Sequence, residues 1–250
     1  MEGGGPRSQE ILLAEERMVT LSIQGVGDFP TMALPRDLPA LAAGFAFTEG
    51  IVSGLGEIAL VQACPDDPDL VRLLPEDPEK ARRPRRNLVI TGSCGVCGGD
   101  RALEEFFRDV PPVRDTLRVG RDWFRRAEEV LLENQELYRA TRGTHAAGIF
   151  DARGEMLAFA EDVGRHNALD KAIGTCLLSG KETRGAGLLL SSRLSFELVA
   201  KCARAGIELA AAVSAPSSLA VEAAHRWGVT LCAPLREKGL PVLTHARRIA

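Results

Sequence analysis

From residue 145 onward, short apolar segments alternate with segments that have apolar residues at helical spacing. The apolar segments lie at 145–150, 156–160, 187–191, 208–213, 229–232 and 241–244, and the helical patterns lie at 166–178, 195–205 and 216–227. Strands that alternate with helices at this spacing pair in parallel through right-handed crossovers. The runs GLLLS and LAAAVS are apolar throughout, which indicates strands covered on both faces. We therefore expect a three-layer α/β domain over residues 111–250, with ligands bound beyond the carboxyl ends of its strands.

The first 110 residues have a different pattern, which predicts a smaller α+β domain. Residues 17–34 alternate between apolar and polar side chains around Gly25 and Gly27, as in a β-hairpin. Residues 37–52 are apolar at helical spacing and predict a buried helix. Further extended segments are expected at 57–63, 70–74 and 87–91. A long amphipathic helix over 121–139 then leads into the larger domain.

The composition is typical of a globular protein and excludes two classes of partner. No uncharged apolar run approaches the roughly 18 residues of a membrane span, and the N-terminus lacks the apolar core of a signal peptide. We therefore expect a cytoplasmic protein with no membrane contact. The basic stretch ARRPRR (81–86) follows the acidic stretch PEDPEK, and the net charge is −3. A solvated loop is expected there, with no nucleic-acid partner.

Cys94 and Cys97 form a CxxC motif between the apolar run 87–91 and the helical pattern 101–109. Unpaired backbone N–H groups at a helix start lower the pKa of a nearby thiol, and the thiolate is the reactive form. The flanking glycines would let the backbone move, so that the sulfurs could reach a partner. One CxxC alone is compatible with half a zinc site, a thioredoxin-like redox pair, a sulfur relay or two thiols without chemistry. Zinc would need two more ligands, and the sequence has no second CxxC and no HxxxH.

The other four cysteines are expected to be small core side chains. Cys64, Cys176, Cys202 and Cys232 lie among apolar neighbours in predicted strands or helices. Buried free cysteines in such settings behave as small hydrophobic residues. In a cytosolic protein, structural disulfides between them are not expected.

One polar segment lies where a predicted strand gives way to a helix. EDVGRHNALDKAIG (161–174) carries Arg165, His166, Asn167, Asp170 and Lys171, all of which could face the strand ends. Helix capping would account for about two of these side chains. The remainder predict a phosphate-bearing ligand or acid–base chemistry at the helix start. His145, at the start of a strand, is more typical of a hydrogen-bonded structural histidine.

The next strand ends are rich in serine, and together they indicate one ligand pocket. SSRLSFE (191–197) and AVSAPSSLAVEAA (211–224) each follow an apolar strand and open a helix, where a phosphate would be received. Each turn alone is compatible with an ordinary helix cap. The predicted contributors are Ser191, Ser192, Arg193 and Ser214. In the loop APLREKG (233–239), Arg236 and Lys238 could close over a phosphate or be solvated.

Taken together, several of these segments resemble the FdhD family of formate dehydrogenase accessory sulfurtransferases. The resemblance runs from about residue 17 to the C-terminus. The matching segments are GFAFTEGI, SCGVCG, THAAGIFD, EDVGRHNALDKAIG, SSRLSFELVAKCARAGI, AVSAPSSLAVEAA and VLTH. The string EDVGRHNALDK is the most specific of them.

The resemblance implies a cytoplasmic homodimer that accepts sulfur from a cysteine desulfurase as a persulfide. The sulfur would pass to the molybdenum of the bis(molybdopterin guanine dinucleotide) cofactor, Mo-bisMGD, before that cofactor enters formate dehydrogenase. Cys94 matches the persulfide carrier and Cys97 its partner. The family's cofactor-binding stretch matches Pro234, Leu235, Arg236, Glu237, Lys238 and Gly239. The serine and arginine turns would hold guanine nucleotide phosphates.

The resemblance also implies a cytidine-deaminase fold for the larger domain. Deaminase chemistry uses an HxE motif and a PCxxC motif that bind zinc, whereas this chain has HAA at 145–147 and PSSL at 216–219. We therefore expect that fold without zinc or deamination. Two rival functions stay open: a non-catalytic chaperone that binds and delivers the molybdenum cofactor, and a zinc-dependent or dithiol redox protein.

Overall fold

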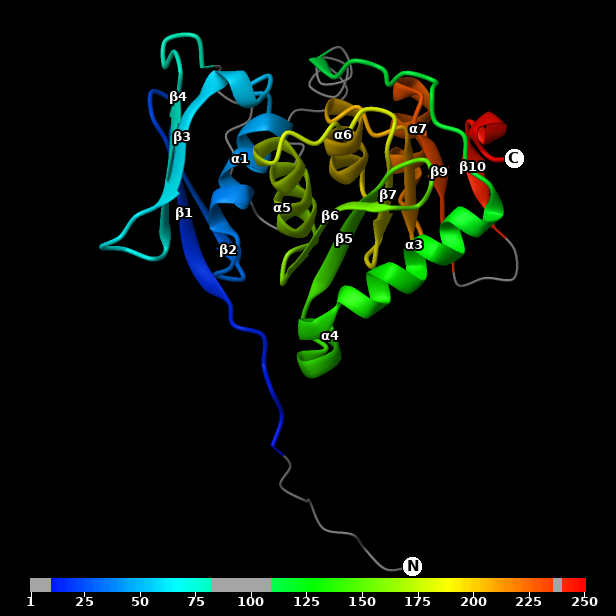
Figure 1. Ribbon diagram of the computed structural model, residues 1–250, viewed down its shortest axis with the longest axis horizontal. Coiled ribbons are helices and arrows are strands. Elements are labelled where there is room, and N and C mark those ends of the chain that lie inside the picture. Colours follow the sequence, from blue (N-terminus) through cyan, green and yellow to red (C-terminus); the bar gives the residue numbers. More distant parts are fainter. Residues whose placement is uncertain (1–9, 82–108, 236–239) are drawn as a thin grey trace, which may run out of the picture.

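Two β-sheets with helices packed between and beside them form the fold (Figure 1). The computed structural model describes residues 10–81, 109–235 and 240–250. The first sheet contains β1 (Arg17–Ile23), β2 (Gly27–Ala33), β3 (Ile58–Ala63) and β4 (Leu70–Pro75). The second contains β5 (His145–Phe150), β6 (Met156–Asp162), β7 (Gly187–Leu190), β8 (Leu209–Ala212), β9 (Thr230–Cys232) and β10 (Val242–Thr244). The helices are α1 (Leu38–Thr48), α3 (Arg121–Asn134), α4 (Glu136–Thr141), α5 (Arg165–Leu178), α6 (Phe196–Arg204) and α7 (Ser218–Trp227), with 3₁₀ turns at Leu55–Glu57 and Ala246–Arg248.

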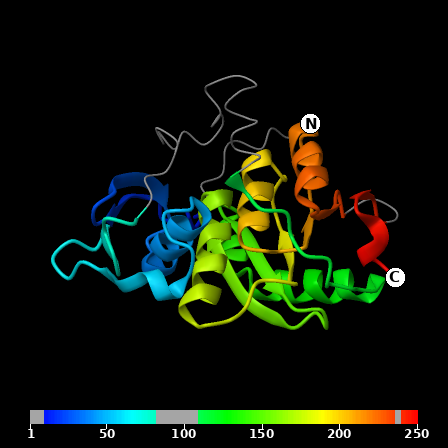
Figure 2. The ribbon, with the colours of Figure 1, turned by 90° about the horizontal axis from the view of Figure 1, so that it is seen from above.

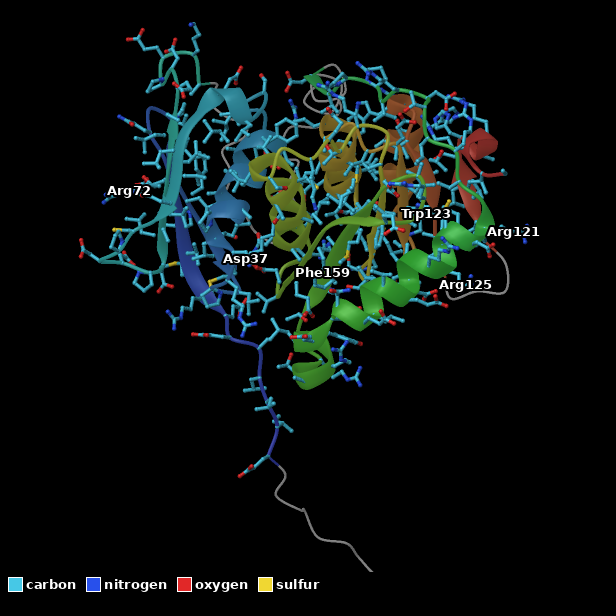
Figure 3. The ribbon with its side chains drawn as sticks, in the orientation of Figure 1. Asp37, Arg72, Arg121, Trp123, Arg125 and Phe159 are labelled. Atoms are coloured by element: carbon cyan, nitrogen blue, oxygen red, sulfur yellow. The ribbon has the colours of Figure 1, made fainter. Side chains whose placement is uncertain are left out.

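The first sheet has the strand order β2-β1-β4-β3, and the predicted hairpin over 17–34 is confirmed as β1 and β2. Gly25 in the connecting turn has a φ of 79°, a left-handed conformation that costs glycine little. Side chains alternate between the two faces of the sheet, so Val19 and Leu21 are buried while Arg72 points away from α1 (Figure 3). We call β1–β4 with α1 the N-terminal unit.

Helix α1 joins the N-terminal unit to the rest of the molecule. It is apolar on every side, because it packs on the first sheet and also against α5 (Figure 2). The two helix backbones touch where they cross. A Cβ atom at Gly44 would collide with the backbone oxygen of Asp170, and one at Gly174 with that of Ala40. Glycine at these two positions therefore permits the crossing.

The second sheet is mixed, with the strand order β10-β9-β8-β7-β5-β6. Strands β7, β8 and β9 are parallel, as the alternating pattern predicts. The prediction is wrong for the other strands, because β5 runs antiparallel to both β6 and β7, and β10 runs antiparallel to β9. The short turn at 151–155 makes β5 and β6 a hairpin, and α5 then crosses over β5 to reach β7. Hydrophobic periodicity carries no information about this insertion of β5.

Helices cover both faces of the second sheet, giving three layers. Helices α5, α6 and α7 share one hydrophobic cluster with alternate sheet residues such as Ile149 and Leu188. Helix α3 packs on the opposite face, where Trp123 meets Phe150 with ring centroids 5.9 Å apart. In Figure 3, Arg121 and Arg125 lie on the outer side of α3. The cytidine-deaminase likeness of this arrangement stays a prediction.

The single helix predicted over 121–139 is wrong, since the chain breaks at Gln135 into α3 and α4. The carboxylate of Glu161 accepts hydrogen bonds from the backbone N–H groups of Leu137 and Tyr138, at 2.9 and 2.8 Å. These are the groups that the start of a new helix leaves without intrahelical acceptors. The carboxylate of Glu161, on β6, therefore stabilises the start of α4.

Two predicted elements fall between the described ranges 10–81 and 109–235. The predicted strand at 87–91 and nearly all of the predicted helix at 101–109 lie outside them. The predicted domain division at residue 110 stays a prediction. Among the described residues, no helix is long and apolar enough to cross a membrane.

Candidate functional site at the carboxyl edge of the second sheet

The polar turns predicted from the sequence meet at one edge of the second sheet. Strands β6, β7, β8 and β9 all end there, and β5 begins there, because His145 pairs with Asp162 and Ala147 pairs with Leu190. Helices α5, α6 and α7 start from the same edge. We call this the carboxyl edge. Loops beyond strand ends carry ligand sites in sheets of this type.

His145, Arg165 and His166 lie close enough at the carboxyl edge to interact electrostatically. Burial lowers the pKa of the half-buried His145, and the nearby positive charges of Arg165 and His166 lower it further. The Nε atom of Arg165 is buried and has no hydrogen-bond partner among the described residues. A buried donor without a partner costs free energy, so this guanidinium is suited to an acceptor from outside the chain.

His166 is held by a carboxylate of the next helix. Its Nε2 lies 3.0 Å from Oε2 of Glu197 and 3.5 Å from Oγ of Ser195. The side chains of His166 and Glu197 are 19% and 27% exposed, so the pair is partly open to solvent. An imidazole fixed by a carboxylate can present its other nitrogen to a ligand.

The serines after β7 are used within the fold. The Oγ of Ser191 accepts a hydrogen bond from the N–H of Ala146, and the hydroxyl of the buried Ser192 donates to the backbone oxygen of Arg193. The exposed side chain of Arg193 makes no ion pair or hydrogen bond within the described ranges. Helix α6 starts only at Phe196, so Ser191 and Ser192 lie before it rather than at its first turn. Arg193 is therefore the group of this turn with spare capacity for an anion.

The turns after β8 and β9 lie beside those after β7. Ser214 follows β8 and is half-buried, while Ser217 caps α7 by accepting from the N–H of Ala220. Pro234 and Leu235 follow β9, and the N–H of Leu235 donates to the backbone oxygen of Ala212. The rest of the predicted cofactor stretch, Arg236, Glu237, Lys238 and Gly239, lies outside the described residues.

The prediction that all five polar side chains of 165–171 face the strand ends is wrong for Asp170 and Lys171. Both are buried and turn toward the N-terminal unit and α6. Asp170 binds Lys201 and Thr48, and Lys171 binds Asp162. Thr48 and Lys201 are far from Asp170 in the sequence, and Lys171 also donates to the backbone oxygen of Leu34, 137 positions away, which is why the local pattern misplaced both side chains.

Asn167 also makes its contacts inside the protein. Its Nδ2 donates to the backbone oxygen of Met32 at 2.8 Å and to Oδ1 of Asp162 at 3.1 Å. Of the five polar side chains predicted at 165–171, Arg165 and His166 are thus the two that act on His145.

Glu197 and Asp162 are site residues that the sequence reasoning missed. Glu197 could have been found as an acid in the first turn of α6, directly after the serine-rich turn. Asp162 is the last residue of β6, directly after Glu161, and is fully buried, a position where a charge requires partners.

Cys94 and Cys97 lie outside the described residues. The other four cysteines are buried free thiols, as predicted. Burial raises the pKa of Cys176 to about 11 and that of Cys202 and Cys232 to about 12. These three thiols are therefore protonated at neutral pH and are poor nucleophiles. Within the described ranges, no group of three His, Cys, Asp or Glu side chains could hold a metal ion.

The segment that carries Cys94 and Cys97 leaves and rejoins the described structure at two well-packed points. Ala81 packs on the core of the N-terminal unit, and Asp109 forms an ion pair with Arg204 at 2.9 Å. Arg204 is in the last turn of α6, whereas the first turn of this helix lies at the carboxyl edge. The segment therefore rejoins the fold away from that edge.

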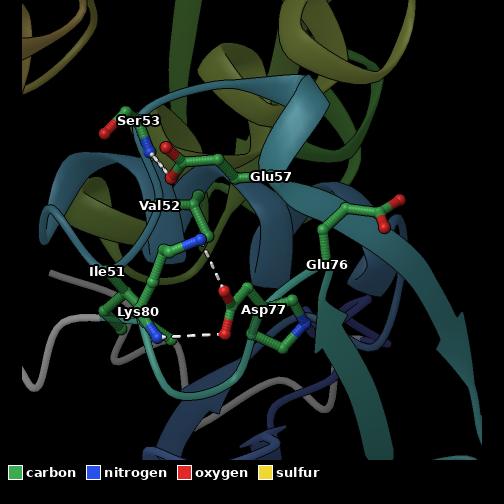
Figure 4. A pocket seen from close by; sticks show the side chains of 9 residues that line it. Ile51, Val52, Ser53, Glu57, Glu76, Asp77 and Lys80 are labelled. Carbon is green, nitrogen blue, oxygen red and sulfur yellow. Dashed lines mark hydrogen bonds and ion pairs between the residues drawn. The ribbon is translucent and has the colours of Figure 1, made fainter.

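A pocket of about 530 Å³ lies beside Ala81 (Figure 4). It is lined by the turn after α1 (51–53), Glu57, the end of β4 with the turn after it (75–77), Lys80 and Ala81. Asp77 pairs with Lys80, and Glu57 accepts from the backbone N–H of Ser53. Three of its four charged side chains therefore already have partners, whereas Arg165 at the carboxyl edge keeps a donor without one among the described residues.

Comparison with known proteins agrees with the sequence resemblance. The family model described as the FdhD/NarQ family matches residues 14–250. The chain is 39% identical to the sulfur carrier protein FdhD of Bordetella bronchiseptica, over 95% of this chain and 87% of that protein. It is 38% identical to the protein of the same name from Agrobacterium fabrum, over 98% of this chain and 92% of that one.

A solved structure has the same fold. The crystal structure of a putative formate dehydrogenase accessory protein from Desulfotalea psychrophila superimposes with a TM-score of 0.81 at 26% identity, covering 100% of this chain and 96% of that one. The agreement extends over both sheets rather than one of them. The chain therefore belongs to the FdhD/NarQ family.

Proposed function

We propose that this chain is a sulfurtransferase that carries sulfur on Cys94 as a persulfide and delivers it to Mo-bisMGD for formate dehydrogenase. One observation supports this choice of residue most directly. Three of the four described cysteines have raised thiol pKa values because they are buried, and Cys64 is buried as well. The CxxC pair contains the two cysteines that lie outside these core segments.

The loading step is a thiolate exchange on sulfur. The thiolate of Cys94 attacks the terminal sulfur of a persulfide on a cysteine desulfurase. The new bond joins Cys94 Sγ to that sulfur, and the bond to the donor cysteine breaks, so the donor leaves as a thiolate. Atoms and electrons balance with no further reactant.

The delivery step requires two electrons, because the sulfur of a persulfide must leave as sulfide. The thiolate of Cys97 can supply them by attacking Sγ of Cys94, which releases hydrosulfide to the metal and leaves a Cys94–Cys97 disulfide. A dithiol reductant then restores both thiols. This step gives the second cysteine of the motif a role distinct from that of the first.

The acceptor, Mo-bisMGD, is a substrate that carries phosphates and guanine bases. The carboxyl edge has side chains that suit such a ligand, since Arg165 has an unpartnered buried donor and Arg193 is free of ion pairs within the described ranges. Arginine binds phosphate with paired donors. Ser191, Ser192, Ser214, His166 and the stretch Pro234 to Gly239 complete the proposed binding surface, and Asn167 supports it from inside the protein.

The partners follow from the same proposal. A cysteine desulfurase donates the sulfur, formate dehydrogenase receives the cofactor, and the chain acts as a homodimer in the cytoplasm. The similarity to the Desulfotalea protein, a putative formate dehydrogenase accessory protein, supports the client. The name of the Bordetella relative, a sulfur carrier protein, supports the cargo.

Radioactive sulfur tests the relay. A cysteine desulfurase loaded from ³⁵S-cysteine should label the wild-type chain, and Cys94→Ala should abolish the label. Cys97→Ala should keep the label but fail to release it as sulfide. Cys64→Ala is a matched control, because it removes a buried thiol and should change neither result.

Three outcomes would overturn the relay. An unlabelled wild-type chain that binds the cofactor would support the non-catalytic chaperone instead. Equal labelling of wild type and Cys94→Ala would place the sulfur on another residue. Stoichiometric zinc that is lost on mutating either Cys94 or Cys97 would favour the metal-binding alternative.

A further inference from the structure

The buried polar groups of residues 162–171 connect α5 to the N-terminal unit. Asn167 donates to the backbone oxygen of Met32, Lys171 donates to that of Leu34 at 2.9 Å, and Asp162 accepts from the N–H of Leu34 at 3.1 Å. All three bonds join residues more than 120 positions apart in the sequence. We call Asp162, Asn167 and Lys171, with the β2 end at 32–34, the polar junction.

Asp162 is the centre of the polar junction. Its Oδ2 accepts from the N–H of Leu34 and pairs with Nζ of Lys171 at 2.6 Å. Its Oδ1 accepts from the N–H of Gly164 at 2.8 Å and from Nδ2 of Asn167. Four donors therefore satisfy one fully buried carboxylate, which fixes its position.

The polar junction also holds the first turn of α5. Gly164 is the N-cap of this helix, and no side chain caps the first turn; instead Asp162 holds the Gly164 N–H and the side chain of Asn167, the third residue of the helix. Arg165 and His166 are the first two residues of the same turn. The direction in which they point therefore depends on bonds made by their neighbours.

A direct ligand contact by Asn167 is the rival explanation. Its side chain is 7% exposed, and its amide nitrogen already has two acceptors. A ligand at the carboxyl edge would have to break one of these bonds to use that nitrogen. Breaking a buried hydrogen bond offsets most of the gain from making a new one.

We infer that Asp162 and Asn167 are positioning residues, which aim Arg165 and His166 at the carboxyl edge and tie that edge to the N-terminal unit. The ligand part of this inference rests on the proposed function. The positioning part does not, because it concerns the free protein.

The histidines provide a test that needs no ligand. The chain has four of them: His145 and His166 at the carboxyl edge, and His225 and His245 near the C-terminus. Imidazole NMR signals of the free Asn167→Ala protein should shift for His166, whose contact with Glu197 depends on the first turn of α5. The signals of His225 and His245 should stay in place.

Asn134→Ala is the matched control. It also removes an amide donor that bonds a backbone oxygen at 2.8 Å, the length of the Asn167 bond to Met32. Thermal unfolding of both variants shows how much of any effect is loss of stability. Asn134→Ala should leave the His166 signals unchanged. Unchanged His166 signals in Asn167→Ala would overturn the positioning role.

GDP serves as the probe for the ligand part. Asn167→Ala should weaken GDP binding roughly 3- to 10-fold, because a misaimed Arg165 or His166 would lose about one hydrogen bond to the ligand. The salt dependence of the affinity should not change, because no charge is removed. Arg165→Ala should reduce the salt dependence, because it removes a charge. An Asn167→Ala protein with shifted His166 signals and undiminished GDP binding would overturn the link to the ligand. Wild-type protein that binds no GDP would overturn the proposal that the carboxyl edge binds the cofactor. The His166 signals of the free proteins would still test the positioning role.

Discussion

The two edges of the second sheet differ in whether their charged side chains are fully paired within the protein. At the edge where β8 and β9 begin, Glu208 and Arg248 are both fully buried and bind each other at 3.0 Å. At the carboxyl edge, Arg165 keeps a donor without a partner among the described residues, and the His166 pair is partly exposed. One edge uses its charges to hold the fold, and the other keeps part of its charge available.

At the edge where β8 and β9 begin, the charged groups bind partners within the chain, so we call it the saturated edge. Glu208 also accepts from the N–H groups of Thr116 and Leu117, and Arg248 donates to the backbone oxygen of Gly228 and to Oγ1 of Thr230. These bonds tie the C-terminus and the chain before α3 to the same strand start. A group with every donor and acceptor used inside the chain has no capacity for a ligand, so its role is structural.

The largest expected effect is on stability at the saturated edge. Arg248→Met should lower the free energy of unfolding by about 3–5 kcal/mol, because it leaves the Glu208 carboxylate buried without its cation. Urea unfolding measures the change. Arg247→Met, at a neighbour whose side chain is 55% exposed, should cost at most about 1 kcal/mol. Equal losses in the two variants would contradict the contrast between the edges.

The next effect is on binding at the carboxyl edge. Arg165→Ala should weaken GDP binding roughly 10- to 100-fold, the effect of losing a charged hydrogen-bond donor, and should change stability by at most about 0.5 kcal/mol. Isothermal titration calorimetry and urea unfolding measure the two quantities. Arg184→Ala removes an exposed arginine before β7, at the opposite edge, and should leave GDP binding unchanged. A large stability loss in Arg165→Ala would make this arginine structural, like Arg248.

A third prediction concerns acid stability at the saturated edge. Burial alone would raise the pKa of Glu208, but hydrogen bonds from Thr116, Leu117 and Arg248 outweigh it and hold the pKa below its usual value of 4.5. Stability from this group is therefore fully present above about pH 4.5 and is lost as pH falls through the lowered pKa. Unfolding free energies measured from pH 7 to pH 3 should fall less steeply for Glu208→Gln than for wild type. Glu222→Gln, at a half-exposed carboxylate, should keep the wild-type slope.

The contrast between the edges was only partly predictable from the sequence. Periodicity gave β7, β8 and β9, and the rule that ligands bind at strand carboxyl ends then selected Arg165 and His166. The saturated edge was not predictable, because Glu208 and Arg248 are 40 residues apart and show no local pattern. Lys171 was misplaced for a similar reason, since one of its partners is the backbone oxygen of Leu34, 137 positions away. Residues whose roles depend on distant partners need the fold.

The smallest expected effect is a change in the pKa of His145, which reports the charge of Arg165 at the carboxyl edge. Burial is the main cause of the lowered pKa of His145, and the charge of Arg165 adds to it. Arg165→Gln should therefore raise the pKa of His145 toward its ordinary value of 6.5 while leaving most of the shift in place. Imidazole NMR titration measures the pKa, and Arg184→Gln should not alter it. A bound anion should raise the same pKa, because it offsets the positive charge, so GDP binding should be accompanied by proton uptake at a pH below the ordinary histidine value of 6.5. A His145 pKa that responds to neither Arg165→Gln nor GDP would mean that Arg165 directs its charge away from the carboxyl edge.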